Sequence, residues 1–368
     1  MDLRQKVYYD LKTHLTYLSD KNVVDLLKKA FLTDSNVSKG WGNNIVITVN
    51  DHKVFTKSIP VTDIEHNNQF DSSNLYNLPL YYNYGVGSAG VNCNRELLMH
   101  VKTTNWVLDG TIDNFPLLYH WRIVDSTMVD SLNNNEKEVL DMSTNPDFAK
   151  YVTRWNSNKQ IEKYMIDRST AKYKLILFLE YIPTTLYSWL NDDISKIDVY
   201  STQMTKLLTF LRHHDIYHMD GHVGNILTDG KTMYLTDFGM CQDLEFTNSS
   251  EEVKFIKDHE NYDFCHMYSN IHQYLTEKMR EDKNADYFLK KYGIDWSRIK
   301  IEDIHTIYKN LRDISEYLGL SKEYVDYLER TKEQHLIYSN FLMTLRRNPK
   351  KDTPYPKTEI DQLLSKLM

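Results

Sequence analysis

The chain has 368 residues, and the usual size of protein domains therefore predicts two or three domains, or two lobes around one cleft. Apolar residues make up 41% and charged residues 26%, a balance that excludes wholesale disorder and a fibrous repeat. The formal net charge is −7. Because such a chain has no global basic field, we expect neither nucleic acid nor a membrane surface as a partner.

Hydropathy and the cysteine positions further limit the class of protein. The longest apolar run, Leu175 to Leu179, is far shorter than the ~20 residues that cross a bilayer. The first eighteen residues carry charges every few positions, which does not fit a signal peptide, so we expect a cytoplasmic protein. The three cysteines, Cys93, Cys241 and Cys265, are widely spaced and predict neither a disulfide framework nor a zinc site.

The first half of the chain mixes helices and strands. Helical spacing of apolar residues predicts two helices over 3–31. An apolar, polar, apolar pattern predicts a β-hairpin over 45–58. Further along, we expect a helix over 94–107, a strand over 115–124, helix around 136–165 and an apolar strand over 173–181.

Beyond Pro183 the pattern is helical except for a short β-rich piece at 225–238. A mixed half followed by a helical half predicts an α+β fold of two lobes. The expected organisation is a helical extension (1–35), a small β-rich lobe with an insertion (36–182), a large helical lobe (183–345) and a basic, proline-punctuated, solvated tail (346–368).

The strongest motif is H-x-D-x-x-x-x-N over His218 to Asn225, followed twelve residues later by Asp237-Phe238-Gly239. This ordered pair resembles the catalytic and metal-binding loops of the protein-kinase-like superfamily, which includes protein kinases and the aminoglycoside and choline phosphotransferases. The resemblance covers roughly residues 38–280 and implies a bilobal kinase-like fold that uses ATP and Mg²⁺. Carboxylate and amide oxygens suit a hard cation, so Asn225 and Asp237 are the expected metal ligands. By the same resemblance, Asp220 is the catalytic base.

A kinase-like site also needs a lysine for the phosphates, on a strand that follows a glycine-containing turn. Lys57 has this place in the predicted hairpin, fifteen residues after Gly42, and Gly40 and Gly42 would form the phosphate loop. A literal G-x-G-x-x-G at 85–90 competes with this loop. Because a helix and not a strand follows it, we interpret it as a tight loop leading into that helix.

The resemblance places further roles upstream and downstream of Lys57. Glu96, which opens the helix over 94–107, is the expected partner of Lys57, and Glu136 is the rival. The strand over 173–181 resembles the one that leads into the adenine-binding hinge, with Glu180 and Ile182 offering backbone groups to adenine. Asp263 matches the aspartate that braces the catalytic loop.

Departures from the family pattern bear on the substrate. Met219 stands where many protein kinases carry arginine, and His222 stands where serine/threonine kinases carry lysine and small-molecule kinases carry histidine. We therefore expect an atypical serine/threonine protein kinase. The alternatives are a small-molecule phosphotransferase of the aminoglycoside or choline type, and a pseudokinase that only binds nucleotide.

Overall fold

The computed structural model describes residues 2–33, 38–39, 43–130 and 145–367. The chain forms two compact units: unit 1 is residues 1–183 with 234–253, and unit 2 is residues 184–233 with 254–368. The fold class is α+β, as expected, because an antiparallel sheet dominates unit 1 and helices dominate unit 2. Within the described ranges, no helix is both long enough and apolar enough to cross a membrane.

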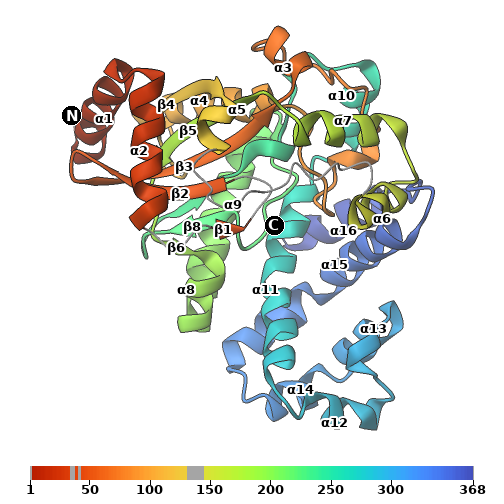
Figure 1. The fold of residues 1–368 in the computed structure, drawn as a ribbon. Helices are drawn as coiled ribbons and strands as arrows, with labels where there is room; N and C mark the ends of the chain where they lie inside the picture. Colours follow the sequence, from red (N-terminus) through yellow and green to blue (C-terminus); the bar gives the residue numbers. More distant parts are fainter. Residues whose placement is uncertain (1, 34–37, 40–42, 131–144, 368) are drawn as a thin grey trace. The chain divides into compact units, whose positions relative to one another are not determined.

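An antiparallel sheet with strand order β1-β2-β3-β5-β4 forms the centre of unit 1 (Figure 1). Asn50 and Asp51 both have positive φ, as a two-residue hairpin turn between twisted strands requires, and they join β2 to β3. The predicted hairpin is therefore confirmed. The strands are β1 (Ser38–Lys39), β2 (Asn43–Val49), β3 (His52–Val61), β4 (Leu118–Asp125) and β5 (Tyr173–Glu180).

Helix α4 (Cys93–Leu108) covers one face of this sheet. Its buried side chains Cys93 and Leu97 pack against alternate residues of β5, Leu175, Leu177 and Leu179. Alternation places these leucines on one face of the strand, and full burial of each contributes about 1.5–3 kcal/mol. The side chain of Asn92 accepts a hydrogen bond from the Asn94 amide and so caps the helix at its N-terminus.

The N-terminal helices belong to unit 1 and pack on its sheet, α1 against β4 and α2 against β2. They confirm the two helices predicted over 3–31. Helix α1 starts at a capping box formed by Asp2 and Gln5. The other helices that lie wholly in unit 1 are short. The bounds are α1 (Leu3–Tyr17), α2 (Asp20–Thr33), α3 (Asp63–Asn67), α5 (Ser126–Asp130), α6 (Pro146–Arg154) and α7 (Lys159–Ser169).

The chain returns to unit 1 after its first passage through unit 2. Strand β9 (Met233–Leu235) leads into this second segment, and the 3-10 helix η4 (Phe238–Met240) and strand β10 (Gln242–Asp243) follow. The Leu235 amide donates to the Asn114 carbonyl, 3.0 Å away, and η4 packs against α4. Asp237 is therefore grouped with the sheet that carries Lys57.

Unit 2 is built around helix α11 (Tyr262–Glu281), which packs against α9 (Ile197–His213) and α15 (Lys322–Arg347) (Figure 1). The short strands β6 (Thr184–Thr185) and β8 (Ile226–Thr228) pair antiparallel. Helix α10 (Ser250–Asp258) starts in unit 1 and ends in unit 2. The remaining helices of unit 2 are α8 (Leu186–Asp192), α12 (Ala285–Leu289), α13 (Ile301–Lys309), α14 (Leu311–Tyr317) and α16 (Lys357–Leu367).

The C-terminal segment, expected from its basic, proline-punctuated sequence to be a solvated tail that packs on the surface, contains a helix. Residues 357–367 form α16, which packs on α15 and buries Ile360 and Leu364 almost completely. These two residues are one helical turn apart, so they share one face. Pro356 ends the extended stretch directly before the helix.

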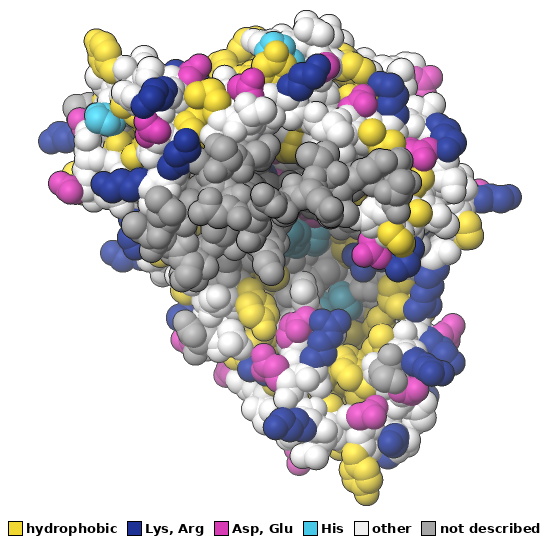
Figure 2. All heavy atoms as spheres, viewed as in Figure 1, with side chains coloured by type: hydrophobic (Ala, Val, Ile, Leu, Met, Phe, Trp, Pro, Cys, Tyr) yellow, Lys and Arg dark blue, Asp and Glu magenta, His cyan; other side chains and the backbone are white. Residues whose placement is uncertain are grey.

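Charged side chains of both signs are interspersed on the face that Figure 2 shows. This distribution agrees with the small net charge of −7. Neighbouring opposite charges cancel at a distance, so this face presents no extended field of one sign.

Candidate functional site

Three of the residues singled out from the sequence meet in unit 1. Nζ of Lys57 donates to Oε1 of Glu96 at 2.5 Å and to Oδ1 of Asp237 at 2.8 Å. The expected ion pair between Lys57 and Glu96 is therefore present. Its rival, Glu136, lies outside the described residues. We call Lys57, Glu96 and Asp237 the lysine cluster.

Each member of the lysine cluster is fixed by a different element. Lys57 lies on β3, the central strand of the sheet, opposite Leu177 of β5. Glu96 is in the first turn of α4, where a carboxylate is favoured by the helix dipole. Asp237 precedes η4 with φ 65° and ψ 74°, a left-handed conformation that aspartate tolerates better than most residues.

The electrostatics of the lysine cluster favour the charged lysine. Burial opposes the charge of Lys57, yet Asp237 and Glu96 outweigh burial and raise its pKa above the ordinary value. Burial raises the pKa of Glu96, and Lys57 offsets part of that effect. The Glu96 side chain is 6% exposed, that of Lys57 14% and that of Asp237 43%. Asp237 is thus the member that can present a carboxylate oxygen to a ligand.

The G-x-G-x-x-G loop packs on the segment that follows Asp237. A Cβ atom on Gly90 would lie 2.8 Å from the carbonyl oxygen of Gly239, and Gly90 has φ +84°, so only glycine fits there without strain. Oγ of Ser88 lies 3.1 Å from Sδ of Met240. The loop leads directly into α4, as its interpretation as a tight loop requires.

A buried hydrogen-bond network also joins α4 to this segment. Arg95 is 1% exposed and donates from Nη1 to Oε1 of Gln242 at 3.2 Å and from Nη2 to Oε1 of Glu252 at 2.9 Å. Sequence reasoning missed this network. Its one signal was an arginine next to Glu96, directly before the apolar run Leu97 to Met99.

The second set of predicted residues lies in unit 2, on the loop 218–225. Nδ2 of Asn225 donates to the backbone oxygen of Asp220 at 2.9 Å and to its Oδ2 at 3.3 Å. Nε2 of His222 lies 3.9 Å from the same Oδ2. The two bonds fix the orientation of the Asn225 amide and use its nitrogen, which leaves Oδ1 as the atom that can bind a cation.

Asp263, at the start of α11, braces this loop in the way the resemblance implies. Its Oδ2 accepts from the His218 amide at 2.6 Å, and its Oδ1 accepts from the Met219 amide at 2.8 Å. Met219 is fully buried with φ 64°, a conformation that costs a non-glycine residue about 1–3 kcal/mol. Burial raises the pKa of Asp263 to about 6, although the two amides act to lower it.

The remaining predicted positions are not in the lysine cluster or on the loop 218–225. Gly40 and Gly42 lie outside the described residues. Glu180 ends β5, where its amide donates to the Leu117 carbonyl at 2.8 Å. Its carboxylate accepts three hydrogen bonds from Arg4, an interaction that the sequence did not suggest. Ile182 is buried just beyond the strand.

In unit 1 these groups offer a charged lysine and the Asp237 carboxylate to a ligand, and in unit 2 the loop 218–225 offers the Asp220 carboxylate and the Asn225 amide oxygen. Within the parts of the chain that the structure describes, no group of three or more histidine, cysteine, aspartate or glutamate side chains could hold a metal ion by itself. The sequence matches no known protein-family model, and no curated protein gives a match.

Proposed function

We propose that the protein is an ATP- and Mg²⁺-dependent kinase that transfers the γ-phosphoryl group to a hydroxyl. The observation that carries this proposal is the position of Lys57 between Glu96 and Asp237, three residues from separate parts of the chain. A buried lysine held charged by two carboxylates, one of them exposed, suits a triphosphate with its cation. The braced loop 218–225 with Asp220 and Asn225 supports the same reaction. The finer proposal, a bilobal kinase-like fold, rests on the resemblance of the motifs.

The proposed roles follow from the charges. Lys57 binds the α- and β-phosphate oxygens, and Glu96 keeps its side chain extended toward them. Asp220 orients the acceptor hydroxyl and takes its proton. The bond between the γ-phosphorus and the β,γ-bridging oxygen breaks, a bond from the acceptor oxygen to that phosphorus forms, and ADP leaves.

The donor set fits magnesium. Mg²⁺ is commonly held by one or two protein carboxylate or amide oxygens, with substrate phosphates and water completing its shell. Asp237 and Asn225 provide two such oxygens in this chain. Bound Mg²⁺ would neutralise charge on the phosphate oxygens. Gly40, Gly42, Glu180 and Ile182 remain the proposed contacts to ATP.

For the acceptor we propose serine or threonine hydroxyls of a protein. The support is the complete Asp-Phe-Gly sequence and the hinge-like segment after Leu179, both of which resemble protein kinases. Because Met219 provides no cation to bind a phosphorylated loop, we propose activity without prior phosphorylation of residues 238–262.

A small-molecule acceptor is the second candidate, favoured by a cavity of about 470 Å³ in unit 2. Its volume is typical of ligand sites. Among the described residues that line it, Glu277 is the single carboxylate, and Arg280 lies 2.5 Å from it. A cationic acceptor such as an aminoglycoside or choline would find no uncompensated negative charge there. This charge balance argues against that branch of small-molecule kinases.

The test is incubation with γ-labelled ATP and Mg²⁺, with and without a cell extract, followed by separation of labelled macromolecules from labelled small molecules. We expect label on serine or threonine of the protein itself or of extract proteins. Asp220→Asn, prepared in parallel, controls for contaminating kinases. If only a metabolite carried the label, the acceptor would be a small molecule and not a protein. No transferred label, with ATP intact, would contradict the kinase proposal.

A further inference from the structure

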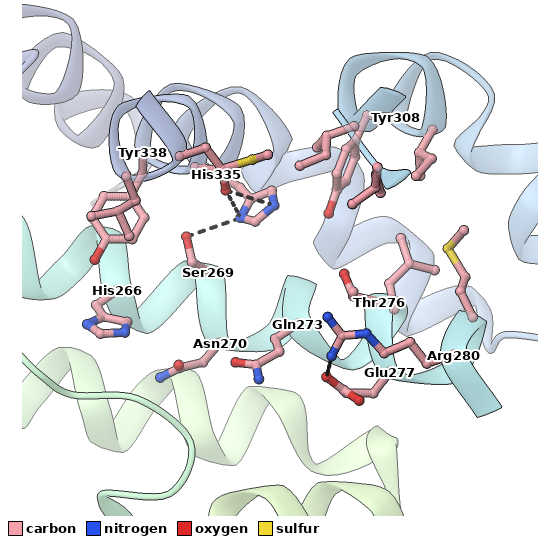
Figure 3. Close-up of a pocket in the computed structure, with 18 of the residues that line it drawn as sticks. His266, Ser269, Asn270, Gln273, Thr276, Glu277, Arg280, Tyr308, His335 and Tyr338 are labelled. Atoms are coloured by element: carbon pink, nitrogen blue, oxygen red, sulfur yellow. Dashed lines mark hydrogen bonds and ion pairs between the residues drawn. The ribbon is translucent and has the colours of Figure 1, made fainter. Parts of the chain in front are cut away.

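The cavity of unit 2 is lined by α11, by α13 with the segment before it, and by α15 (Figure 3). Its polar wall is a single stripe of α11, with residues such as His266, Asn270, Gln273 and Glu277 three or four positions apart. Such spacing keeps side chains on one face of a helix. From residue 266 to residue 280 this stripe extends about 21 Å, at 1.5 Å per residue.

The other walls come from α13, from α15 and from the segment before α13. Ile304 and Ile307 contribute apolar side chains from α13, and Leu342 and Met343 do so from α15. Helix α15 also contributes polar side chains, among them Ser339. An occupant of about this volume therefore meets apolar side chains as well as the polar stripe.

Most polar groups of the cavity already have partners within unit 2. Nδ1 of His335 lies 3.1 Å from Oγ of Ser269, and Glu277 pairs with Arg280. His266 offers a further polar atom: among the described residues, its Nδ1 is buried without a hydrogen-bond partner. A buried polar nitrogen without a partner costs free energy, which a ligand atom would recover.

Among the described residues of the lining, Arg346 is a charged side chain without an ion pair. Burial, together with the neighbouring His222, His218 and Arg346, lowers the pKa of His266 to about 3. Arg346 therefore lies within electrostatic reach of His266, while Glu277 and Arg280 are about three helical turns or more further along α11. With His266 neutral and Glu277 paired with Arg280, Arg346 is the remaining charge among the described residues of the lining.

We propose that this cavity is a binding site for a small organic anion with an apolar body. The anionic group lies between Arg346 and His266, whose neutral ring can donate a hydrogen bond from Nδ1, and the body packs against Ile304, Ile307 and Met343. The site adjoins the loop 218–225, because Asn270 both lines the cavity and donates to the Gly221 carbonyl at 2.8 Å. The inference goes beyond the proposed function and does not depend on it.

The test compares two fluorescent probes that share one aromatic body. 1-Anilinonaphthalene-8-sulfonate carries a sulfonate, and N-phenyl-1-naphthylamine lacks it. Both are titrated into the full-length protein at low ionic strength. We expect saturable binding of one molecule per chain, with the sulfonate bound at least about threefold more tightly, because a partly exposed ion pair contributes up to a factor of about five.

Variants of neighbouring residues on α15 locate the site. Arg346→Gln should remove the preference for the sulfonate, whereas Arg347→Gln, next to it and outside the lining, should keep it. Met343→Trp should fill the cavity and weaken the binding of both probes at least tenfold. Leu342→Trp replaces it as the cavity-filling variant if Met343→Trp does not fold. The proposal is overturned by unsaturable binding to the wild type, by equal affinity for the two probes, or by unchanged binding in a folded cavity-filling variant.

Discussion

Replacing Asp263 with asparagine changes one oxygen into an NH₂ group and keeps the size of the side chain. In the wild type both carboxylate oxygens are used, one by the His218 amide and one by the Met219 amide. Asparagine has a single acceptor oxygen, so one of the two amides loses its partner. The buried Met219, at φ 64°, would then be free to relax, and Asp220 would move with it.

Two opposing terms decide the effect on stability. A pKa raised from 3.8 to about 6 means that ionising the Asp263 carboxyl costs about 3 kcal/mol more in the folded protein than in water. Asparagine avoids this cost but leaves one buried amide unpaired, at about 1–3 kcal/mol. We therefore expect the free energy of unfolding of Asp263→Asn to lie within about 2 kcal/mol of the wild-type value at pH 7. Phosphoryl transfer should nevertheless fall about 100-fold, because catalysis depends on the position of Asp220.

The stability that Asp263 contributes depends on pH with a definite sign. The folded protein takes up a proton at Asp263 near pH 6, and the unfolded chain does so near pH 3.8. Between these values the folded state binds more protons, so the stability from this group rises as the pH falls and is lost as the pH rises through 6. Chemical denaturation of both proteins from pH 4 to pH 7 measures the effect. A difference in unfolding free energy that stays constant with pH, or full activity in Asp263→Asn, would refute this reasoning.

Three further predictions concern the proposed reaction. Lys57→Met should lower phosphoryl transfer at least 100-fold, whereas Lys102→Met, on α4, should leave it within about threefold; the reverse order in a transfer assay would reinstate the loop 85–90 as the phosphate loop. Glu96→Gln removes the charge that orients Lys57, so it should raise the KM for ATP while the protein stays folded. An unchanged KM would argue against that role. Phosphatase treatment of bacterially produced protein should leave its activity unchanged, and a large loss would show that residues 238–262 need phosphorylation.

Local patterns predicted the hairpin, and the family resemblance predicted the members of the lysine cluster. The apolar runs of 45–58 and the polar pair Asn50-Asp51 sufficed for the β2-β3 hairpin, because alternation and turn chemistry act between neighbouring residues. The pairing of Glu96 with Lys57 was expected because the helix-then-strand order after Glu96 resembles that of the kinase-like family. The class of the fold was predictable from local patterns.

Long-range partners could not be predicted in this way. Asp237 bonds to Lys57 across 180 positions of sequence, and Arg4 bonds to Glu180 across 176. No local periodicity encodes which distant segments meet, so the grouping of residues 234–253 with unit 1 was not visible in the sequence. The polar residues and proline of 346–359 concealed the two buried contacts of α16, Ile360 and Leu364.

The most direct test of the proposed kinase is the rate at which purified protein transfers the γ-phosphoryl group of ATP to a hydroxyl in the presence of Mg²⁺. We predict measurable transfer by the wild type, and a rate at least 100-fold lower for Asp220→Asn, which keeps Lys57, Asn225 and Asp237 but lacks the carboxylate that takes the proton. Equal rates for the two proteins, or no transfer by the wild type, would contradict the account.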